Sequence, residues 1–254
     1  MAAPIIMVHG AFCGGWAFER FTAPFEAAGH VVHAPDLRGH GPNDRAEAVT
    51  GVSMLDYAAD IAALAKSLPE PPILLGHSMG GLVCQLAAAR TPVRGLALLA
   101  PSAPWGVRGS TVEEAVTAFG LHLLGPFWTT AVEPDASLMR TYSLNRMSRP
   151  DREAAVARLR RESGRALWET LNWWLDPFMT TSVSFGQRPA AMLTLVGDGD
   201  VVHPPATVRQ TAARLGSACE VLPGMSHWLI GEPGWEAVAE RLIQWLDREV
   251  RAAA

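Results

Sequence analysis

The chain of 254 residues is 49% hydrophobic and 18% charged, which is typical of a folded globular protein and excludes a largely disordered one. Its formal net charge of -4 offers no basic face, so we expect no nucleic-acid partner. We also expect no signal peptide, because the apolar run at 5–8 is too short for the apolar region of one and has no basic flank. No apolar run reaches the roughly 18 residues that cross a bilayer, so we expect no membrane partner.

The cysteines are odd in number and far apart, at Cys13, Cys84 and Cys219. They lack the spacing of metal ligands, so they predict free thiols in a cytoplasmic protein. The sequence implies neither a metal nor an organic cofactor.

The first hundred residues alternate apolar runs with helical patterns. Nearly continuous apolar runs predict buried strands at 4–8, 30–34, 72–75 and 95–100. The spacing of Trp16, Phe21 and Phe25 indicates a helix after the first strand. A second helix is expected from the N-cap Ser53, with Asp56 three residues on, to Leu68. This order indicates a parallel sheet that is covered on both faces.

The alternation stops after Pro101. Residues 102–189 carry helical patterns and no convincing strand, and apolar runs at 192–197 and 218–222 then resume it, followed by a last helix at 235–250. The sequence therefore predicts an α/β fold with a mostly parallel sheet of about six strands and helices on both faces. The predicted core comprises residues 1–101 and 190–254, and residues 102–189 form an inserted helical cap.

Residues 76–80 read Gly-His-Ser-Met-Gly, the G-x-S-x-G pattern of a nucleophile elbow. Such a turn strains the backbone and brings a helix close to a strand, and both need residues without a Cβ. A strand pattern precedes the motif and an alanine-rich helix pattern follows it. Ser78 is therefore the candidate nucleophile.

A serine hydroxyl becomes a strong nucleophile only when a base takes its proton and an acid orients that base. Asp200 and His227 each follow one of the last two predicted strands, and loops after parallel strands meet at one edge of the sheet. We expect Ser78, Asp200 and His227 to converge there. Asp198 is the alternative acid, although a turn-forming role suits it, and His203 is the alternative base.

Acyl transfer also needs N–H donors for the developing oxyanion. The backbone N–H of Met79 is one candidate, and the loop after the first strand offers that of Ala11, with Phe12 as the alternative. Three further histidines are expected to make hydrogen bonds rather than to catalyse: His77, which would orient the elbow, and the loop residues His9 and His40.

Together these motifs resemble the α/β-hydrolase superfamily. The elbow, the His9-Gly10 loop, the loop at 35–41, the segment 197–204 and His227-Trp228 match in kind and order. The opening at 9–16 resembles the small esterase and hydroxynitrile-lyase branch, which implies that two N-terminal strands of larger members are absent. Ser226 departs from the pattern, since a glycine often precedes the histidine.

The resemblance also excludes some chemistries. Haloalkane dehalogenases and epoxide hydrolases use an aspartate at the elbow, where this chain has Ser78. Cyanohydrin lyases rely on a lysine of the cap, whereas Lys66, the only lysine, lies outside it.

The predicted cap is rich in aromatic residues and arginines. We expect a substrate pocket lined by Phe12, Trp105, Trp128, Trp174 and Trp228, although the cap aromatics could instead only pack it onto the core. Adjacent residues cannot face the same way on a helix, so Trp173 and Trp174 cannot both point inward. Arg158, Arg160 and Arg161 are expected on a solvated face, balanced by Asp151, Glu153 and Glu162, with an anion site as the alternative.

The sequence thus predicts a serine hydrolase that cleaves small to medium apolar or aromatic carboxylic esters through an acyl-enzyme. Its expected partner is a small-molecule ester. Two alternatives remain: a C–C bond or lactone hydrolase that uses the same triad, and a small-molecule binding protein without turnover.

Overall fold

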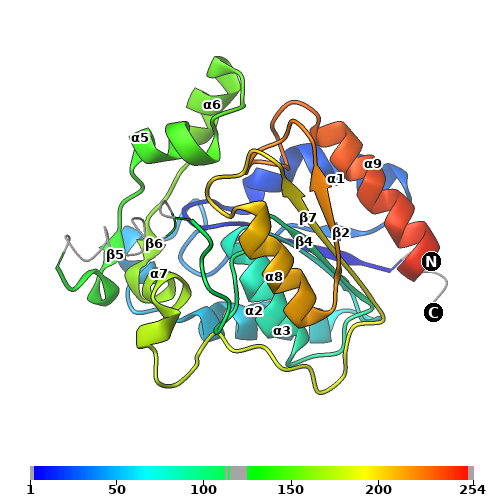
Figure 1. Cartoon of the computed structure of the whole chain (residues 1–254), viewed down its shortest axis with the longest axis horizontal. Coiled ribbons are helices and arrows are strands. Elements are labelled where there is room, and N and C mark those ends of the chain that lie inside the picture. The colour runs from blue at the N-terminus through cyan, green and yellow to red at the C-terminus, as the bar shows by residue number, and fades with distance from the viewer. Residues whose placement is uncertain (1–2, 112–113, 115–124, 251–254) are drawn as a thin grey trace.

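The computed structural model describes residues 3–111, 114 and 125–250, and its centre is a six-stranded sheet in the order β2-β1-β3-β4-β7-β8 (Figure 1). Every neighbouring pair is parallel, so the carboxyl ends of the strands share one edge. The strands are β1 (Ile5–Val8), β2 (Val32–His33), β3 (Ile73–His77), β4 (Gly95–Leu99), β7 (Ala191–Gly197) and β8 (Ala218–Leu222). The predicted α/β class and strand number are confirmed.

Strand β1 shows why these strands are apolar at every position. Ile5 and Met7 belong to the buried cluster that contains Phe21 and Trp245, whereas Ile6 and Val8 belong to the cluster on the opposite face. Side chains alternate between the two faces of a strand, so a sheet buried on both faces needs apolar residues throughout.

Helices cover both faces of the sheet (Figure 1). One face carries α1 (Glu19–Ala27) and α9 (Trp235–Trp245), and the other carries α2 (Met54–Ser67), α3 (Met79–Ala88) and α8 (Pro205–Leu215). Shorter helical turns are η1 (Gly15–Phe18), η2 (Ala46–Val49) and η7 (Leu246–Val250), the last a π-helical continuation of α9.

Strand β2 is shorter than expected. The apolar pattern predicts a strand over 30–34, but only Val32 and His33 form one. Strand β2 lies at the edge of the sheet and has a single neighbour, so fewer ladder hydrogen bonds extend it.

Between β4 and β7 the chain leaves the sheet and forms a separate group of short elements, drawn in green at the left of Figure 1. These are η4 (Phe127–Thr129), β5 (Ala131–Val132), α5 (Ala136–Leu138), η5 (Met139–Ser143), α6 (Arg149–Val156), β6 (Glu162–Ser163), α7 (Gly164–Leu171) and η6 (Trp173–Leu175). We refer to this group as the insertion. Strands β5 and β6 form a two-residue antiparallel pair where no strand was expected, because such short segments leave no alternating pattern.

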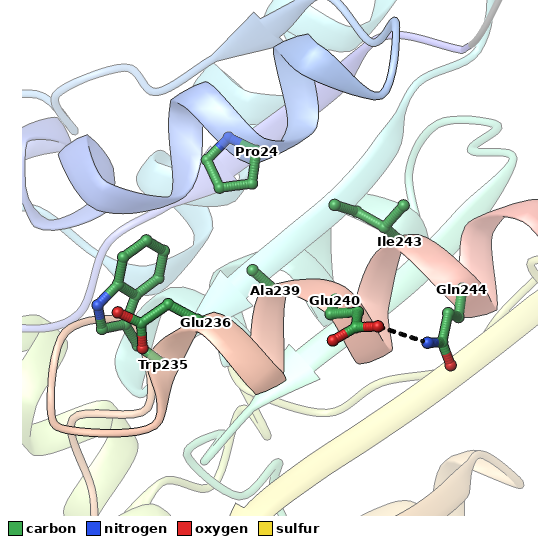
Figure 2. Close-up of a pocket in the computed structure, with 7 residues that line it drawn as sticks. All are labelled: Pro24, Trp235, Glu236, Ala239, Glu240, Ile243 and Gln244. Carbon is green, nitrogen blue, oxygen red and sulfur yellow. Dashed lines mark hydrogen bonds between the residues drawn. The ribbon is translucent and has the colours of Figure 1, made fainter.

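An apolar groove lies between α1 and α9 on the outside of the molecule (Figure 2). Pro24 of α1 faces Trp235, Ala239 and Ile243 of α9 across it, and the polar side chains at its rim also come from α9. The residues that line this groove include none of the candidate site residues.

No helix among the described residues has the length and apolar character needed to cross a membrane. The three cysteines are free, and Cys13 and Cys84 are buried.

Candidate active site

Ser78 lies in the sharp turn between β3 and α3, with φ of 55° and ψ of -124°. Residues other than glycine rarely adopt this conformation, so the surrounding structure must hold it. A Cβ on Gly76 would lie 2.4 Å from the carbonyl oxygen of Gly80, and one on Gly80 would lie 2.2 Å from that of Val8. The glycines of the motif are thus required by the close approach of α3 to the sheet.

Ser78, His227 and Asp200 form one hydrogen-bonded row at the carboxyl edge of the sheet. His227 Nε2 lies 3.0 Å from Ser78 Oγ, and His227 Nδ1 lies 2.9 Å from Asp200 Oδ2. Since the carboxylate accepts the Nδ1–H, the neutral ring leaves Nε2 as an acceptor for the serine hydroxyl. The row therefore has the donor and acceptor arrangement that serine activation requires.

Asp200 is fixed from both sides of its carboxylate. Oδ1 accepts the backbone N–H groups of residues 202 and 203, each at 2.9 Å. Burial acts to raise the pKa of Asp200, but the attraction and hydrogen bond of His227 hold it below its ordinary value. Asp198 is exposed and accepts the N–H of Gly224 at 2.9 Å. The structure thus brings Asp200 to His227 and leaves Asp198 in a turn.

The alternative base, His203, hydrogen-bonds a different serine. Its Nε2 lies 3.0 Å from Ser102 Oγ, and its ring packs edge-on against His227 with centroids 5.3 Å apart. Burial lowers the pKa of His203 to about 4. His203 is therefore a neutral neighbour of the row.

His77 connects the elbow to the loop that carries His227. Its Nε2–H donates to the carbonyl oxygen of His227 at 2.9 Å, and its ring packs edge-on against Trp228. Burial lowers the pKa of His77 to about 3, so the ring is neutral. Its hydrogen bond thus fixes the His227 loop as well as the elbow.

The loop after β1 passes directly over Ser78, since a Cβ on Gly10 would lie 3.0 Å from Ser78 Cβ. Within the described part of the chain, the backbone N–H groups of Ala11 and Met79 donate to no protein acceptor. The Phe12 N–H, in contrast, donates to Glu162 Oε2 at 3.2 Å. Of the three candidate donors, the N–H groups of Ala11 and Met79 are thus the two available to a ligand.

The prediction that Glu162 lies on a solvated face beside the arginines is wrong. Glu162 is 0% exposed, and it accepts the hydroxyl of Tyr57 at 2.6 Å and the N–H of Ser163 at 2.7 Å. The burial of Glu162 could not be predicted, because β6 is only two residues long and shows no periodicity.

The pKa values of the two loop histidines are shifted in opposite directions. His40 has both ring nitrogens near acceptors, the carbonyl of Arg38 at 3.3 Å and Glu162 at 3.1 Å. Burial opposes its protonation, but the attraction and hydrogen bond of Glu162 raise the pKa of His40. His9 accepts a backbone N–H at Nε2 and donates from Nδ1 to the Gly10 carbonyl, and burial with the nearby His40 lowers its pKa to about 4. Glu162 thus favours the protonated form of His40, while His9 is neutral.

The arginines have other partners than those expected. Arg158 forms two hydrogen bonds to Glu19, at 2.6 and 2.8 Å, and Arg161 pairs with Glu133 at 2.5 Å. These side chains are partly exposed, so each pair contributes little stability. The backbone N–H of Arg160 donates to the Phe12 carbonyl at 2.8 Å.

The five candidate pocket residues lie in different surroundings. Trp228 is 4% exposed and packs in the core against Trp16 and His77. Trp128 and Trp174 are 39% and 44% exposed. The remaining two lie under the insertion: Phe12 packs against the cluster of Phe127, Val132 and Leu167, and Trp105 stands edge-on to Trp173.

Comparison with known proteins identifies the family. The model of the "Alpha/beta hydrolase family" matches residues 5–241. A pyrethroid hydrolase from Sphingobium wenxiniae is 35% identical over 112 residues, which are 44% of this chain but only 40% of that protein. Caffeoylshikimate esterase from Arabidopsis thaliana is 28% identical over 253 residues, 93% of this chain and 74% of that protein. The crystal structure of a methylesterase from Arabidopsis shares the fold, with a TM-score of 0.73, 20% identity and coverage of 96% of this chain and 99% of that one. The chain belongs to the alpha/beta hydrolase family.

Proposed function

We propose that the chain is a serine esterase that cleaves small to medium apolar or aromatic carboxylic esters. The observation that carries this proposal is the hydrogen-bonded row of Ser78, His227 and Asp200, with the N–H groups of Ala11 and Met79 available beside it. The names of related proteins, a caffeoylshikimate esterase and a methylesterase, support it.

In the proposed mechanism, Ser78 Oγ attacks the ester carbonyl while His227 Nε2 takes its proton. Asp200 holds the imidazole in the required tautomer and stabilises the imidazolium that forms. The N–H groups of Ala11 and Met79 bind the tetrahedral oxyanion, and each such donor contributes about 3–4 kcal/mol of transition-state stabilisation. His227 then protonates the departing alcohol, which leaves an acyl group on Ser78.

A water molecule completes the cycle. His227 Nε2 takes a proton from the water as it attacks the acyl carbonyl, and returns that proton to Ser78 Oγ when the acid departs. No step in this sequence needs more than these side chains, two backbone donors and water.

The apolar surroundings of the oxyanion loop support the proposed substrate class. Phe12 follows the donor Ala11 and packs with the buried side chains of Phe127 and Leu167. Apolar side chains with a few fixed polar groups are typical of small-molecule sites. We therefore propose that Phe12 contacts the substrate, that Trp128 and Trp174 extend the contact surface on the insertion, and that Trp105 extends it beside Trp173.

A series of p-nitrophenyl esters from acetate to dodecanoate tests the proposal. We expect turnover by the wild-type protein and a loss of at least about 10⁴-fold in both Ser78→Ala and His227→Ala, since members of a triad act as a unit. The preferred chain length would measure the acyl site. Near-full activity in His227→Ala would falsify the triad.

Labelling with a fluorophosphonate separates the alternatives if no ester is turned over. A wild-type protein that labels at Ser78 without ester turnover would favour the C–C bond or lactone hydrolase. A protein that binds ligands but neither labels nor turns over would be the binding protein.

A further inference from the structure

The backbone of Phe12 is held on both sides by the insertion. Its N–H donates to Glu162 Oε2 at 3.2 Å, and its carbonyl accepts the N–H of Arg160 at 2.8 Å. Phe12 has a φ of 64°, in the left-handed region that a side chain with a Cβ disfavours. Two hydrogen bonds from outside the loop thus maintain a strained residue directly after Ala11.

The carboxylate of Glu162 is held in place by four hydrogen bonds. Oε1 accepts from the Tyr57 hydroxyl and the Ser163 N–H, while Oε2 accepts from His40 and from Phe12. An ionised carboxylate has about four acceptor positions, so these four donors satisfy it fully. The insertion therefore contacts the loop after β1 through the buried carboxylate of Glu162, whose acceptor positions are all occupied.

We propose that Glu162 is a positioning residue for the oxyanion hole, through which the insertion fixes the loop that carries the Ala11 N–H. The inference rests on the proposed function for the identity of the oxyanion donors. Glu162 touches no reacting atom. It acts by holding the next peptide of the loop, and it also occupies the Phe12 N–H, so that the loop presents a single donor to the oxyanion.

The chemistry of this site requires a carboxylate and not only a side chain of that shape. Glutamine has one acceptor oxygen and two N–H donors, so in Glu162→Gln an N–H group would face the backbone N–H of either Ser163 or Phe12, neither of which can accept a hydrogen bond. The single acceptor that remains is neutral and therefore weaker than the carboxylate. Unlike a cavity mutation, this change conserves volume and acts on the hydrogen bonds alone. We expect Phe12 to relax from its strained conformation and the Ala11 N–H to move away from the oxyanion position.

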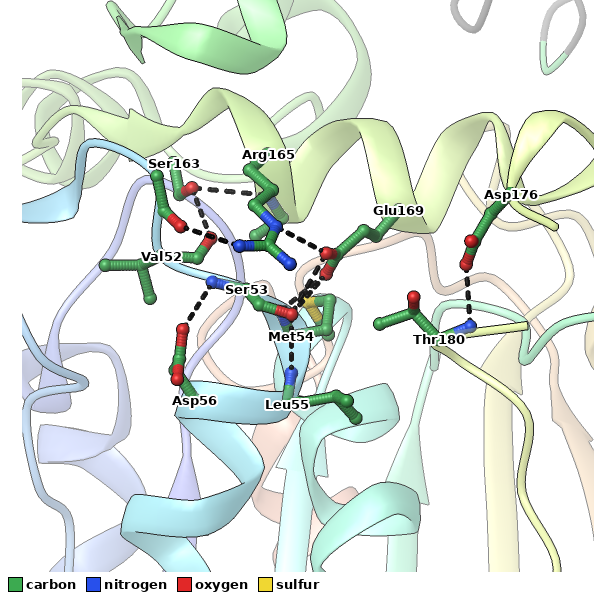
Figure 3. Close-up of polar contacts among 12 residues, drawn as sticks. Val52, Ser53, Met54, Leu55, Asp56, Ser163, Arg165, Glu169, Asp176 and Thr180 are labelled. Carbon is green, nitrogen blue, oxygen red and sulfur yellow. Dashed lines mark hydrogen bonds and ion pairs between the residues drawn. The ribbon is translucent and has the colours of Figure 1, made fainter. Parts of the chain in front are cut away.

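The insertion contains a matched control, Glu169 of α7 (Figure 3). Glu169 is also buried and accepts the Ser53 hydroxyl and the Met54 N–H, each at 2.8 Å, at the start of α2. It thus attaches the insertion to the core as Glu162 does, but has no bond to the oxyanion loop. Glu169→Gln should loosen the insertion without moving Ala11.

The test measures the rate at which a fluorophosphonate labels Ser78 in wild type, Glu162→Gln and Glu169→Gln, with thermal unfolding of each variant. In this reaction a Ser78 Oγ–P bond forms, the P–F bond breaks, the serine proton goes to His227, and the phosphoryl oxygen occupies the oxyanion site. We expect Glu162→Gln to slow labelling by roughly one to two orders of magnitude, since small displacements of catalytic groups are costly. Glu169→Gln should stay within about threefold of wild type.

Ester kinetics provide a second measure. If Glu162 positions an oxyanion donor, Glu162→Gln should lower kcat and leave KM nearly unchanged, because the donor acts on the transition state. Labelling of Glu162→Gln at the wild-type rate would overturn the inference. Equal slowing in Glu169→Gln would also overturn it, by showing that any loosening of the insertion has the same effect.

Two further results keep this inference separate from the proposed function. If the wild type labels but cleaves no ester, the proposed function fails while the labelling rates still decide the role of Glu162. A wild type that does not label overturns both. If Glu162→Gln does not fold, Tyr57→Phe decides, because it removes one donor from Glu162 and should slow labelling about threefold or more; an unchanged rate would overturn the inference.

Discussion

At the scale of single residues, two aspartates in the sequence Gly-Asp-Gly-Asp have different surroundings. Asp200 is buried, with one oxygen on His227 and the other on two backbone N–H groups. Asp198 is exposed and accepts the N–H of Gly224. Comparing substitutions at the two aspartates therefore tests which carboxylate orients His227.

We predict that Asp200→Asn lowers kcat for a p-nitrophenyl ester by about 10³- to 10⁴-fold, because an amide at this position favours the wrong tautomer of His227. Asp198→Asn should change kcat by less than about threefold, since its side-chain oxygen can still accept the Gly224 N–H. Steady-state kinetics of the two variants measure the difference, and equal losses would leave the acid unassigned.

The sequence allowed some residues to be placed better than others for a physical reason. Ser78, Asp200 and His227 could be proposed because a strained turn leaves a glycine pattern and because loops after parallel strands share an edge. Glu162 could not, because nothing local distinguishes it from a surface glutamate. Its burial depends on Tyr57, His40 and Phe12, which lie more than a hundred residues earlier in the chain.

At the scale of elements, the start of α2 is held both by a local capping box and by a hydrogen bond to a residue far along the chain. Ser53 and Asp56 form a capping box, with the Ser53 N–H donating to Asp56 at 2.9 Å. The spacing of these two residues predicted this helix start. The sequence did not reveal that the Ser53 hydroxyl also donates to the buried Glu169 of α7 (Figure 3).

We predict that Ser53→Ala destabilises the protein by about 2 kcal/mol, since it removes an N-cap and deprives a buried carboxylate of a donor. Asp56→Ala should cost about 0.5–1 kcal/mol, because it removes only the partly exposed half of the capping box. Urea unfolding of both variants gives the comparison. A Ser53→Ala cost no larger than that of Asp56→Ala would show that the bond to Glu169 adds nothing.

Apart from the short edge strand β2, the core strands and helices were predicted closely, since their apolar residues follow the regular spacing of a strand or a helix. The insertion was predicted only as helical, and its short pair β5 and β6 was missed. Elements of two or three residues are positioned by their tertiary contacts, and such contacts leave no period in the sequence.

At the scale of the whole molecule, histidines lie close to one another in two places: His9 lies beside His40, and both His77 and His203 lie beside His227. His9 and His77 are buried and His203 is half-buried, and all three are neutral, with pKa values lowered to about 4, about 3 and about 4. Burial is the main cause for each, and a neighbouring histidine adds to it. His40 differs, because Glu162 raises its pKa despite the burial.

These pKa values predict a steep loss of stability in mild acid. Below the ordinary histidine pKa of about 6.5 the unfolded chain takes up protons at His9, His77 and His203, whereas the folded chain does not until about pH 4. Two groups have the opposite effect on stability, because their pKa values are raised in the folded state. Glu232 lets the folded chain take up a proton in acid. The stability that His40 contributes is fully present below pH 6.5 and is lost only as the pH rises through its folded pKa. We therefore expect the free energy of unfolding to fall by roughly 2–4 kcal/mol per pH unit near pH 5.

Urea unfolding at pH 7.5, 6 and 5 measures this slope, and His203→Gln assigns part of it. Glutamine can still hydrogen-bond Ser102 but does not titrate, so the variant should lose about one proton, or about 1.4 kcal/mol per pH unit, from the slope between pH 6 and 5. At pH 7.5 His203 is neutral in both the folded and the unfolded state, so stability there reports packing alone and serves as the reference. A wild-type slope near zero between pH 6 and 5, or the same slope in His203→Gln, would contradict the neutral form of His203 in the folded state.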